Sequence, residues 1–463
     1  MVTMATIEYT AADEPVKVSD PDMDASYHKD DSLAEQADVV MEREDTRTGT
    51  WVTGIFHIIT AVIGAGILSL SYSVGAMGWV GGLIMMIAFA LITLYTSHLL
   101  ADCTKIDGKR IPTYMDCVRT TMGPVHAGII AWVQYFNLFL TAIAYTITPA
   151  TSMQSIAHTY CDAEDPDCFD KYWKFAIIFG ATQIPMSQMP NLESLWWVSA
   201  IGAFMSFAYS VIALALSINM GNHHGTVRGF DASTVQRMWN VWNAMGAIVF
   251  AFSFSFILVE ITETMKETPK RPARFHIKRA VNISMATILC FYLAVSIAGY
   301  MAFGNEIEDC GNILTCFTRP KWVIRMTNIF VIIHMLPAYQ VFSQPIFEFT
   351  ERVVGRRVVK DSRFGKLMFR LSFRSLYVVI VTVIGVCLPF FSDVVGLIGA
   401  IGFWPATVFY PIEMWITVYK PNLTRRILME TLNVICFFIT VMAIAGSVQL
   451  IVVDSKDYTV FGD

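Results

Sequence analysis

An apolar run between residues 57 and 70 carries glycines at its centre, a pattern typical of a membrane helix interrupted for binding. Ile63 is followed there by Gly64, Ala65 and Gly66. Glycine tolerates an unwound backbone and lets a ligand approach the main chain closely. Unwound backbone at membrane depth is stable only where it lines a cavity. The run therefore predicts a binding site for an anion, held by the N–H groups and the positive end of a half-helix.

A second apolar run places two hydroxyls among aromatic rings, in the sequence FSFSF that begins at residue 252. This run has no central glycine, so its serines could equally donate to carbonyls of their own helix, which is common in membrane spans. Two interrupted spans five apart fit an inverted repeat in which the first and sixth spans meet at the ligand. The candidate site therefore gains four residues: Phe252, Ser253, Phe254 and Ser255.

Four further side chains could take part in binding or in proton transfer. Asn137 and Tyr145 are eight residues apart in one apolar stretch and share a helix face, although such groups often only join neighbouring helices. His57 begins the first span and His334 lies in the eighth. Histidine is the side chain that titrates near physiological pH, so both are candidates for proton coupling, with a packing role as the alternative.

Carboxyl groups stand at the ends of several spans. Glu260 and Glu263 directly precede the basic segment 266–279, and we expect them to pair with its cations. Asp393 and Glu413 flank the tenth span. A position at the membrane interface and a role in carrying protons would explain these two residues equally well. The first, third and sixth spans contain no deep lysine or arginine. A bound carboxylate would therefore have to be held by backbone N–H groups and hydroxyls.

The composition places these runs in a membrane protein. Of 463 residues, 55% are hydrophobic and 15% are charged, whereas soluble domains have roughly 25% charged residues. A membrane span needs about 20 mostly apolar residues. We predict an all-α polytopic membrane protein with eleven spans, near residues 52–73, 79–101, 126–150, 172–190, 195–219, 240–263, 281–303, 321–350, 373–391, 394–418 and 428–453.

The distribution of charge predicts the topology. With a cytosolic N-terminus, most basic residues fall in loops on the cytosolic side, as the positive-inside rule requires; the C-terminus is then extracellular. Residues 1–47 hold 13 acidic and 4 basic residues and no apolar signal segment, so we expect a disordered acidic tail. The transporter core would span residues 48–420, and residues 421–463 would form the eleventh span and a short external end.

Cysteines and motifs narrow the classes of function. Cys161 and Cys168 share one predicted external loop, and Cys310 and Cys316 share another. Disulfides within or between these loops are both possible. The sequence has no pattern of metal ligands, no nucleophile elbow and no phosphate-binding loop, so we expect neither a metal site nor an enzyme. The basic residues of its loops are explained by membrane topology, so we expect no nucleic-acid partner.

Seven runs in order resemble the plant amino acid permeases, within the amino acid/auxin permease group of the amino acid–polyamine–organocation superfamily. They are TGTWVTGIFHIITAVIGAGILSL (48–70), MGW with LYTSHLLADC (77–79, 94–103), QYFNLFLTAIAYTI (134–147), SQMPNLESLWWVS (187–199), FSFSFILVEITETMKETP (252–269), AYQVFSQPIFEFTE (338–351) and LPFFSDVVGLIGAIGFWPATVFYPIEM (388–414). The resemblance implies a proton-coupled importer of amino acids at the plasma membrane, working by alternating access. It also implies the leucine-transporter type of five-plus-five inverted repeat, with the eleventh helix outside the ten-helix core.

By this resemblance the substrate carboxylate would meet residues 63–66, and the amino group and side chain would face residues 252–255. The proton would be the coupling ion and no other cofactor is implied. The chain departs from the family at Ala247, where an acidic or amide residue is common, and at Tyr72, where tryptophan is common. The FSFSF centre and Pro337 also differ from the family pattern. The resemblance therefore does not assign this chain a preferred amino acid or a proton-carrying residue.

Several alternatives stay open from the sequence. The substrate could be neutral or acidic amino acids, or the chain could be a related symporter for proline, a betaine or basic amino acids. Sodium could replace the proton, because carbonyls beside a broken helix can coordinate it. A different class is a non-transporting amino acid sensor that signals through its acidic tail. The sequence does not define an oligomeric state.

Overall fold

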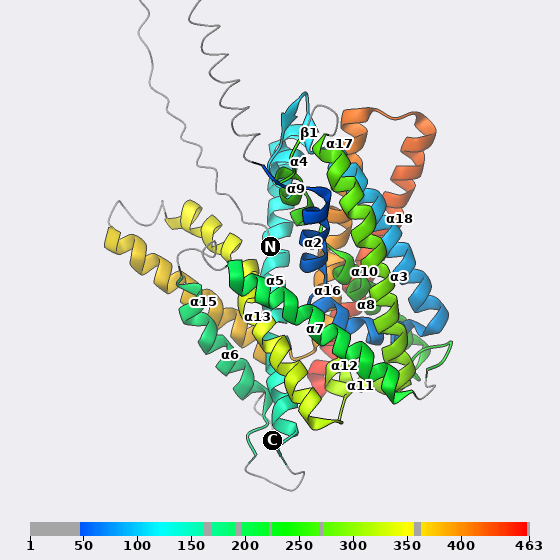
Figure 1. Cartoon of the computed structure of the whole chain (residues 1–463), viewed down its shortest axis with the longest axis vertical. Helices are drawn as coiled ribbons and strands as arrows, with labels where there is room; N and C mark the ends of the chain where they lie inside the picture. The colour runs from blue at the N-terminus through cyan, green and yellow to red at the C-terminus, as the bar shows by residue number, and fades with distance from the viewer. Residues whose placement is uncertain are drawn as a thin grey trace, which may run out of the picture.

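The computed structural model describes residues 47–161, 168–189, 196–221, 225–267, 272–355 and 363–460. These residues form a bundle of long helices that run roughly along one axis (Figure 1). One end of the bundle carries a short antiparallel hairpin of β1 (Lys105–Ile106) and β2 (Lys109–Arg110). We call this the hairpin end and the opposite end the disulfide end. The predicted disordered tail lies outside the described residues, except for Arg47.

Helices account for nearly all of the remaining described structure. Those before residue 253 are α2 (Trp51–Val62), η1 (Ala65–Ser69), α3 (Leu70–Asp102), α4 (Tyr114–Met122), α5 (Pro124–His158), α6 (Tyr172–Ser187), α7 (Trp196–Met220) and α8 (Thr234–Phe252). Those after it are α9 (Ser255–Glu263), α10 (Ala273–Phe303), η3 (Gly304–Glu306), α11 (Ile307–Cys310), α12 (Ile313–Cys316), α13 (Lys321–Thr350), η4 (Glu351–Gly355), α15 (Arg363–Cys387), α16 (Phe391–Gly402), η5 (Phe403–Phe409), α17 (Tyr410–Tyr419) and α18 (Leu423–Asp457). The predicted all-α membrane fold is confirmed.

The number of spans differs from the prediction of eleven. Among the described residues, nine helices are long and apolar enough to cross a membrane. The difference comes from the first and fourth predicted spans, since α2 has 12 residues and α6 has 16. Twelve helical residues extend only about 18 Å. The count of eleven is therefore not confirmed, although each predicted stretch contains helix.

A glycine kink separates the first predicted span from the second. Helix α3 is assigned as continuous from Leu70 to Asp102, but Gly78 has φ +72° and ψ 172°, outside the helical region. A methyl group at Gly78 would lie 2.1 Å from the carbonyl oxygen of Val227. Glycine alone combines that φ with that contact at low cost. The kink falls between the predicted spans 52–73 and 79–101.

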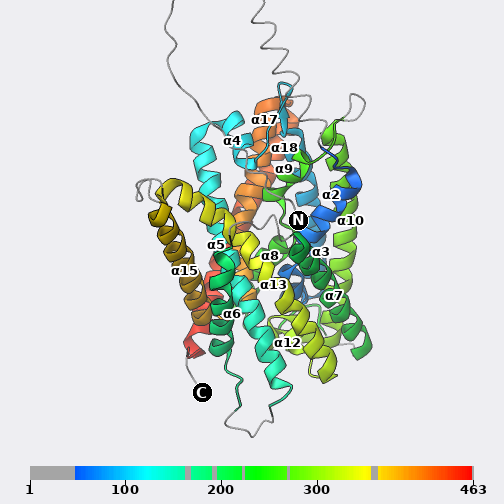
Figure 2. The same cartoon turned by 60° about the vertical axis from the view of Figure 1, so that its left-hand side comes forward.

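The helices pack in groups around the two interrupted spans. Helix α6 lies beside α15, and α5 packs against α13, on one side of the bundle (Figure 2). On the other side α10 packs against α2 and α3. Helix α8 lies between them, in contact with α3, α16 and α18. Helix α8 is largely buried, whereas α2 is buried along one face only. The five-plus-five repeat implied by the resemblance stays a prediction.

Three threonine hydroxyls of α5 are satisfied within their own helix. Thr141, Thr146 and Thr148 of α5 each donate to the carbonyl four residues earlier, at 2.8, 3.0 and 2.8 Å. This back-bonding removes the cost of an unpaired polar group in an apolar interior. These threonines are therefore compatible with a membrane-embedded helix and need no ligand.

Two disulfides close loops at the disulfide end. Cys161 is bonded to Cys168, and Cys310 is bonded to Cys316. The sequence left pairing within and between the loops open, and in the structure each bond stays within its own loop. Both pairs lie at the end opposite the hairpin.

Glycines on both helices let α8 cross α16 closely. A methyl group on Gly399 would lie 2.0 Å from the carbonyl oxygen of Gly246, and one on Gly246 would lie 2.2 Å from that of Gly396. Backbone atoms cannot move aside as flexible side chains do. The two helices can therefore approach this closely only without side chains at the crossing.

We predict that Gly399→Ala destabilises the protein by about 1–3 kcal/mol, the usual cost of overpacking a tight interior. The measurement is the thermal unfolding midpoint of purified protein in detergent. Gly128→Ala is the matched control, since Gly128 is exposed on α5 and a methyl group there meets no atom within 4 Å. Equal midpoints for the two variants would contradict the prediction.

Candidate functional site

Both predicted interruptions are present in the structure. Helix α2 ends at Val62, and Gly64 is extended with φ −148° and ψ −144° before η1 begins at Ala65. Helix α8 ends at Phe252, and Ser253 and Phe254 leave the helical conformation before α9 begins at Ser255. The second break occurs without a glycine, so the composition of the FSFSF run alone did not fix it.

The two breaks lie against each other. A methyl group on Gly66 would be 2.9 Å from the Cα atom of Ala251, in the last turn of α8. Tyr292 of α10 bridges them, because its hydroxyl lies 2.8 Å from the carbonyl oxygen of Val62 and 3.2 Å from that of Ala251. These carbonyls belong to the last turns of α2 and α8, where no intrahelical N–H is available. Tyr292 therefore serves both broken helices.

Two side chains from other helices reach the first break. A methyl group on Gly64 would lie 3.7 Å from the hydroxyl oxygen of Tyr145 and 3.8 Å from Nε2 of His334. Both residues are buried, in α5 and α13. The sequence proposed Gly64, Tyr145 and His334 separately, and the structure brings them together.

The hydrogen bond of His334 defines which ring nitrogen faces the break. Its Nδ1 lies 2.8 Å from the carbonyl oxygen of Gly202 in α7. A carbonyl can only accept, so Nδ1 carries the hydrogen and Nε2 of the neutral ring is an acceptor. Tyr209 of α7 packs edge-on against this ring, with centroids 6.0 Å apart. His334 therefore presents an acceptor near Gly64 and Tyr145.

The residues of the second break have different surroundings. Phe252 is buried with its ring centroid 5.2 Å from that of Tyr292, and Phe254 is buried as well. Ser255 donates to the hydroxyl of Thr407 in the π-helical segment η5 at 3.1 Å. Ser253 is half-buried at the break. The break thus presents mainly aromatic surface and hydroxyls.

Two other candidates lie elsewhere. The amide of Asn137 donates to the carbonyl of Ile398 in α16 at 2.8 Å, so it joins two helices. His57 lines a cavity of about 300 Å³ together with Arg47, Thr53 and Thr264. It precedes Val62 by five residues along α2, roughly 7 Å. His334 is therefore the candidate histidine that adjoins Gly64.

The hairpin end joins the start of α2 to the end of α9. Gly49 N donates to Thr264 O at 3.1 Å, and Lys266 N donates to Gly49 O at 2.8 Å. Arg47 forms an ion pair with Glu263. We predicted that Glu263 pairs with segment 266–279. Among the described residues its cation comes from the segment just before α2, whereas Lys270 and Arg271 of the predicted segment lie outside the described residues. The two half-helices are fastened together at this end.

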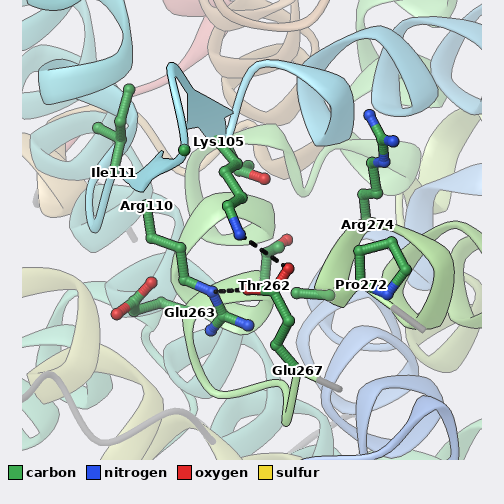
Figure 3. A pocket seen from close by; sticks show the side chains of 11 residues that line it. Lys105, Arg110, Ile111, Thr262, Glu263, Glu267, Pro272 and Arg274 are labelled. Carbon is green, nitrogen blue, oxygen red and sulfur yellow. Dashed lines mark hydrogen bonds and ion pairs between the residues drawn. The ribbon is translucent and has the colours of Figure 1, made fainter. Parts of the chain in front are cut away.

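The hairpin adds a second link to α9 (Figure 3). Lys105 and Arg110 both bind Glu267, each at 3.0 Å, and Arg110 also donates to the carbonyl of Met265 at 3.1 Å. They line a cavity of about 280 Å³ with Arg274 on its other side. Partial burial alone would raise the pKa of Glu267, but the Lys105 hydrogen bond and the Arg110 charge hold that pKa below its usual value. Glu267 is therefore an anion at neutral pH.

Sequence reasoning missed Tyr292 and the hairpin-end contacts. A tyrosine in an apolar span is a common packing residue, and nothing local marks its hydroxyl as the partner of carbonyls on two other helices. Arg47 and Arg110 are remote from Glu263 and Glu267 in sequence. A search for charges at both ends of the two interrupted spans would have named Arg47 and Glu263 together.

Comparison with known proteins identifies the family. The family model described as transmembrane amino acid transporter protein matches residues 47–453. The chain is 39% identical to amino acid permease 2 of Arabidopsis thaliana over 449 residues, covering 90% of each chain. It is 39% identical to amino acid permease 3 of the same plant, covering 90% of this chain and 94% of that one, and 28% identical to its lysine histidine transporter-like 1, covering 95% and 97%. The chain belongs to the plant amino acid permease family of transmembrane amino acid transporters.

Proposed function

We propose that this protein imports amino acids across the plasma membrane, driven by protons and by alternating access, with the substrate at the two helix breaks. The observation that supports this most directly is the meeting of Gly64, Tyr145 and His334 beside the second break. The names of the relatives, amino acid permeases, supply the class of substrate. The plasma membrane location, with a cytosolic N-terminus and an extracellular C-terminus, is part of the proposal.

Backbone capture fits the carboxylate of an amino acid. The first N–H groups of a helix have no intrahelical partner, and the helix dipole favours an anion there. In this chain those groups belong to η1, which begins at Ala65 after Ile63 and Gly64. Within the described part of the chain, the one buried cation is Arg374, and it is paired with Glu351. A carboxylate at the break would therefore rely on N–H groups.

The other half of the substrate would face residues 252–255. Carbonyl oxygens at the end of α8, the Tyr145 hydroxyl and Nε2 of His334 can each accept a hydrogen bond from an ammonium group. Phe252 and Phe254 are buried and offer apolar surface to a side chain. This combination favours a neutral amino acid, with acidic amino acids as a second possibility. No cofactor besides the proton is proposed.

The first prediction of this proposed function concerns the coupling of uptake to protons. Uptake of a radiolabelled neutral amino acid into transport-deficient cells should be at least tenfold faster at pH 5.5 than at pH 7.5 and should carry an inward current. Equal uptake at both pH values without current would refute proton coupling. Replacing sodium by choline should leave uptake unchanged; loss of uptake would favour sodium instead.

The same cells separate the remaining alternatives. Unlabelled proline, betaine and basic amino acids can be tested as competitors of the labelled uptake. Strong competition by one of them would identify a related symporter with that substrate preference. A non-transporting sensor would bind labelled amino acid without accumulating it. Accumulation above the external concentration would exclude the sensor.

The second prediction concerns the substrate site. Gly64→Ala places a methyl group at ordinary contact distance from Tyr145 and His334, so it should fold but raise KM. Gly64→Val should abolish uptake at normal surface expression, because its branched side chain fills the space of the substrate. Gly66→Val is a weaker test, since a Cβ there lies 2.9 Å from the Cα of Ala251 and disturbs helix packing directly. Wild-type KM in both Gly64 variants would contradict the site, with Gly128→Ala as the control.

A further inference from the structure

A buried carboxyl group lies outside the proposed substrate site. Asp393, in the first turn of α16 at the disulfide end, is 4% exposed. Among the described residues it is the one carboxyl-bearing side chain in the buried class. The proposed substrate site does not use it, and α8, with Ala247 near its end, contains no acidic residue. Burying a carboxyl group is costly in free energy, so a carboxyl that is kept buried is a candidate for a functional role.

The partners of Asp393 come from two other long helices. Asn243 of α8 donates to the Asp393 carboxyl from Nδ2 at 2.9 Å, and Oδ1 of the same amide accepts from Ser447 of α18 at 2.7 Å. The carboxyl of Asp454, exposed near the end of α18, neighbours that of Asp393. Asp393 therefore connects α8, α16 and α18.

The surrounding titratable groups bring no cation. From α3, the buried Tyr72 is within electrostatic range of Asp393. From α11, Glu308 acts on Tyr72 through its charge and accepts from Asn240 of α8 at 3.2 Å. None of the partners found for Asp393 in the described structure is a lysine, arginine or histidine. Among the described residues, the Asp393 carboxyl therefore has an amide donor but no cation as a partner.

Two neighbouring carboxyl groups without a cation favour a state that holds one proton. Two carboxylates have only acceptors, so they can share a hydrogen bond only when one of them carries a proton. A buried carboxylate without a partner costs several kcal/mol. The exposed position of Asp454 gives the proton a path from the solution at the disulfide end, which is the external side under the proposed topology.

The proton would act on the helix that leads to the second break. Asn243 and Gly246 are three residues apart and lie on one face of α8. That face packs on α16, where the glycine crossing leaves no space for side chains. Loss of the proton leaves two like charges in contact, which repel α16 and α18 from each other and so change the surface on which α8 packs. Proton occupancy is thereby tied to the position of the half-helix that ends at Phe252.

We propose that Asp393, paired with Asp454, binds the coupling proton and controls the packing of α8 against α16 and α18. This inference rests on the proposed function, since it assigns the residue that couples the proton to amino acid import. It also makes the eleventh helix, α18, a part of the coupling machinery.

The test separates coupling from folding and from transport itself. Asp393→Asn keeps the size and hydrogen bonds of the protonated acid but cannot release a proton. In proteoliposomes, accumulation driven by a proton gradient should fall at least tenfold, while exchange of labelled for unlabelled amino acid without a gradient should stay within about twofold of wild type. Asp309→Asn is the matched control, because Asp309 is exposed at the same end and outside the pair.

Other outcomes decide against the proposal. Wild-type accumulation by Asp393→Asn would overturn it, and so would the loss of both exchange and accumulation in a correctly folded variant. If Asp393→Asn does not fold, Asp454→Asn decides, since its side chain is exposed: a shifted pH for half-maximal uptake supports the pair, and an unchanged pH profile overturns it. Failure of the proposed function is distinguishable, because it would appear as pH-independent uptake in the wild-type protein.

Discussion

An interrupted helix inside a membrane leaves carbonyl and N–H groups without intrahelical partners, and the rest of this structure is arranged around that constraint. Tyr292 places one hydroxyl at the last turns of both α2 and α8. Gly66 lets η1 approach Ala251 closely. Because the two breaks share a partner and a contact surface, they behave as one unit. Any movement of one half-helix must change the hydrogen bonding of the other.

The sequence predicted the first break well because glycines at the centre of an apolar run have a direct physical meaning. The second break could not be derived in the same way, since Ser253 can bond to its own helix or leave it, and only neighbouring helices decide. The same limit applies to Asn137, whose amide serves α16. Hydropathy located every apolar stretch, but the number of complete spans depended on the lengths of α2 and α6, which are shorter than predicted.

Charged and polar contacts hold different parts of the interrupted spans at the two ends of the bundle. At the hairpin end, Arg47 and Glu263 join the start of α2 to the end of α9. At the disulfide end, Asn243 joins α8 to α16 and α18. These contacts involve different half-helices, so one set can be broken while the other is kept. Under the proposed function, this separation is what alternating access requires.

The position of Asp393 explains why its burial could not be predicted from the sequence. Asp393 falls at the boundary between two predicted spans, and an acid at such a boundary is equally compatible with the membrane surface and with the interior. Its burial follows from the glycine crossing of α8 and α16, because a close approach of the two helices encloses whatever side chain stands beside it. A carboxyl buried beside this crossing without a cation depends on hydrogen bonds and, under the proposal, on a proton.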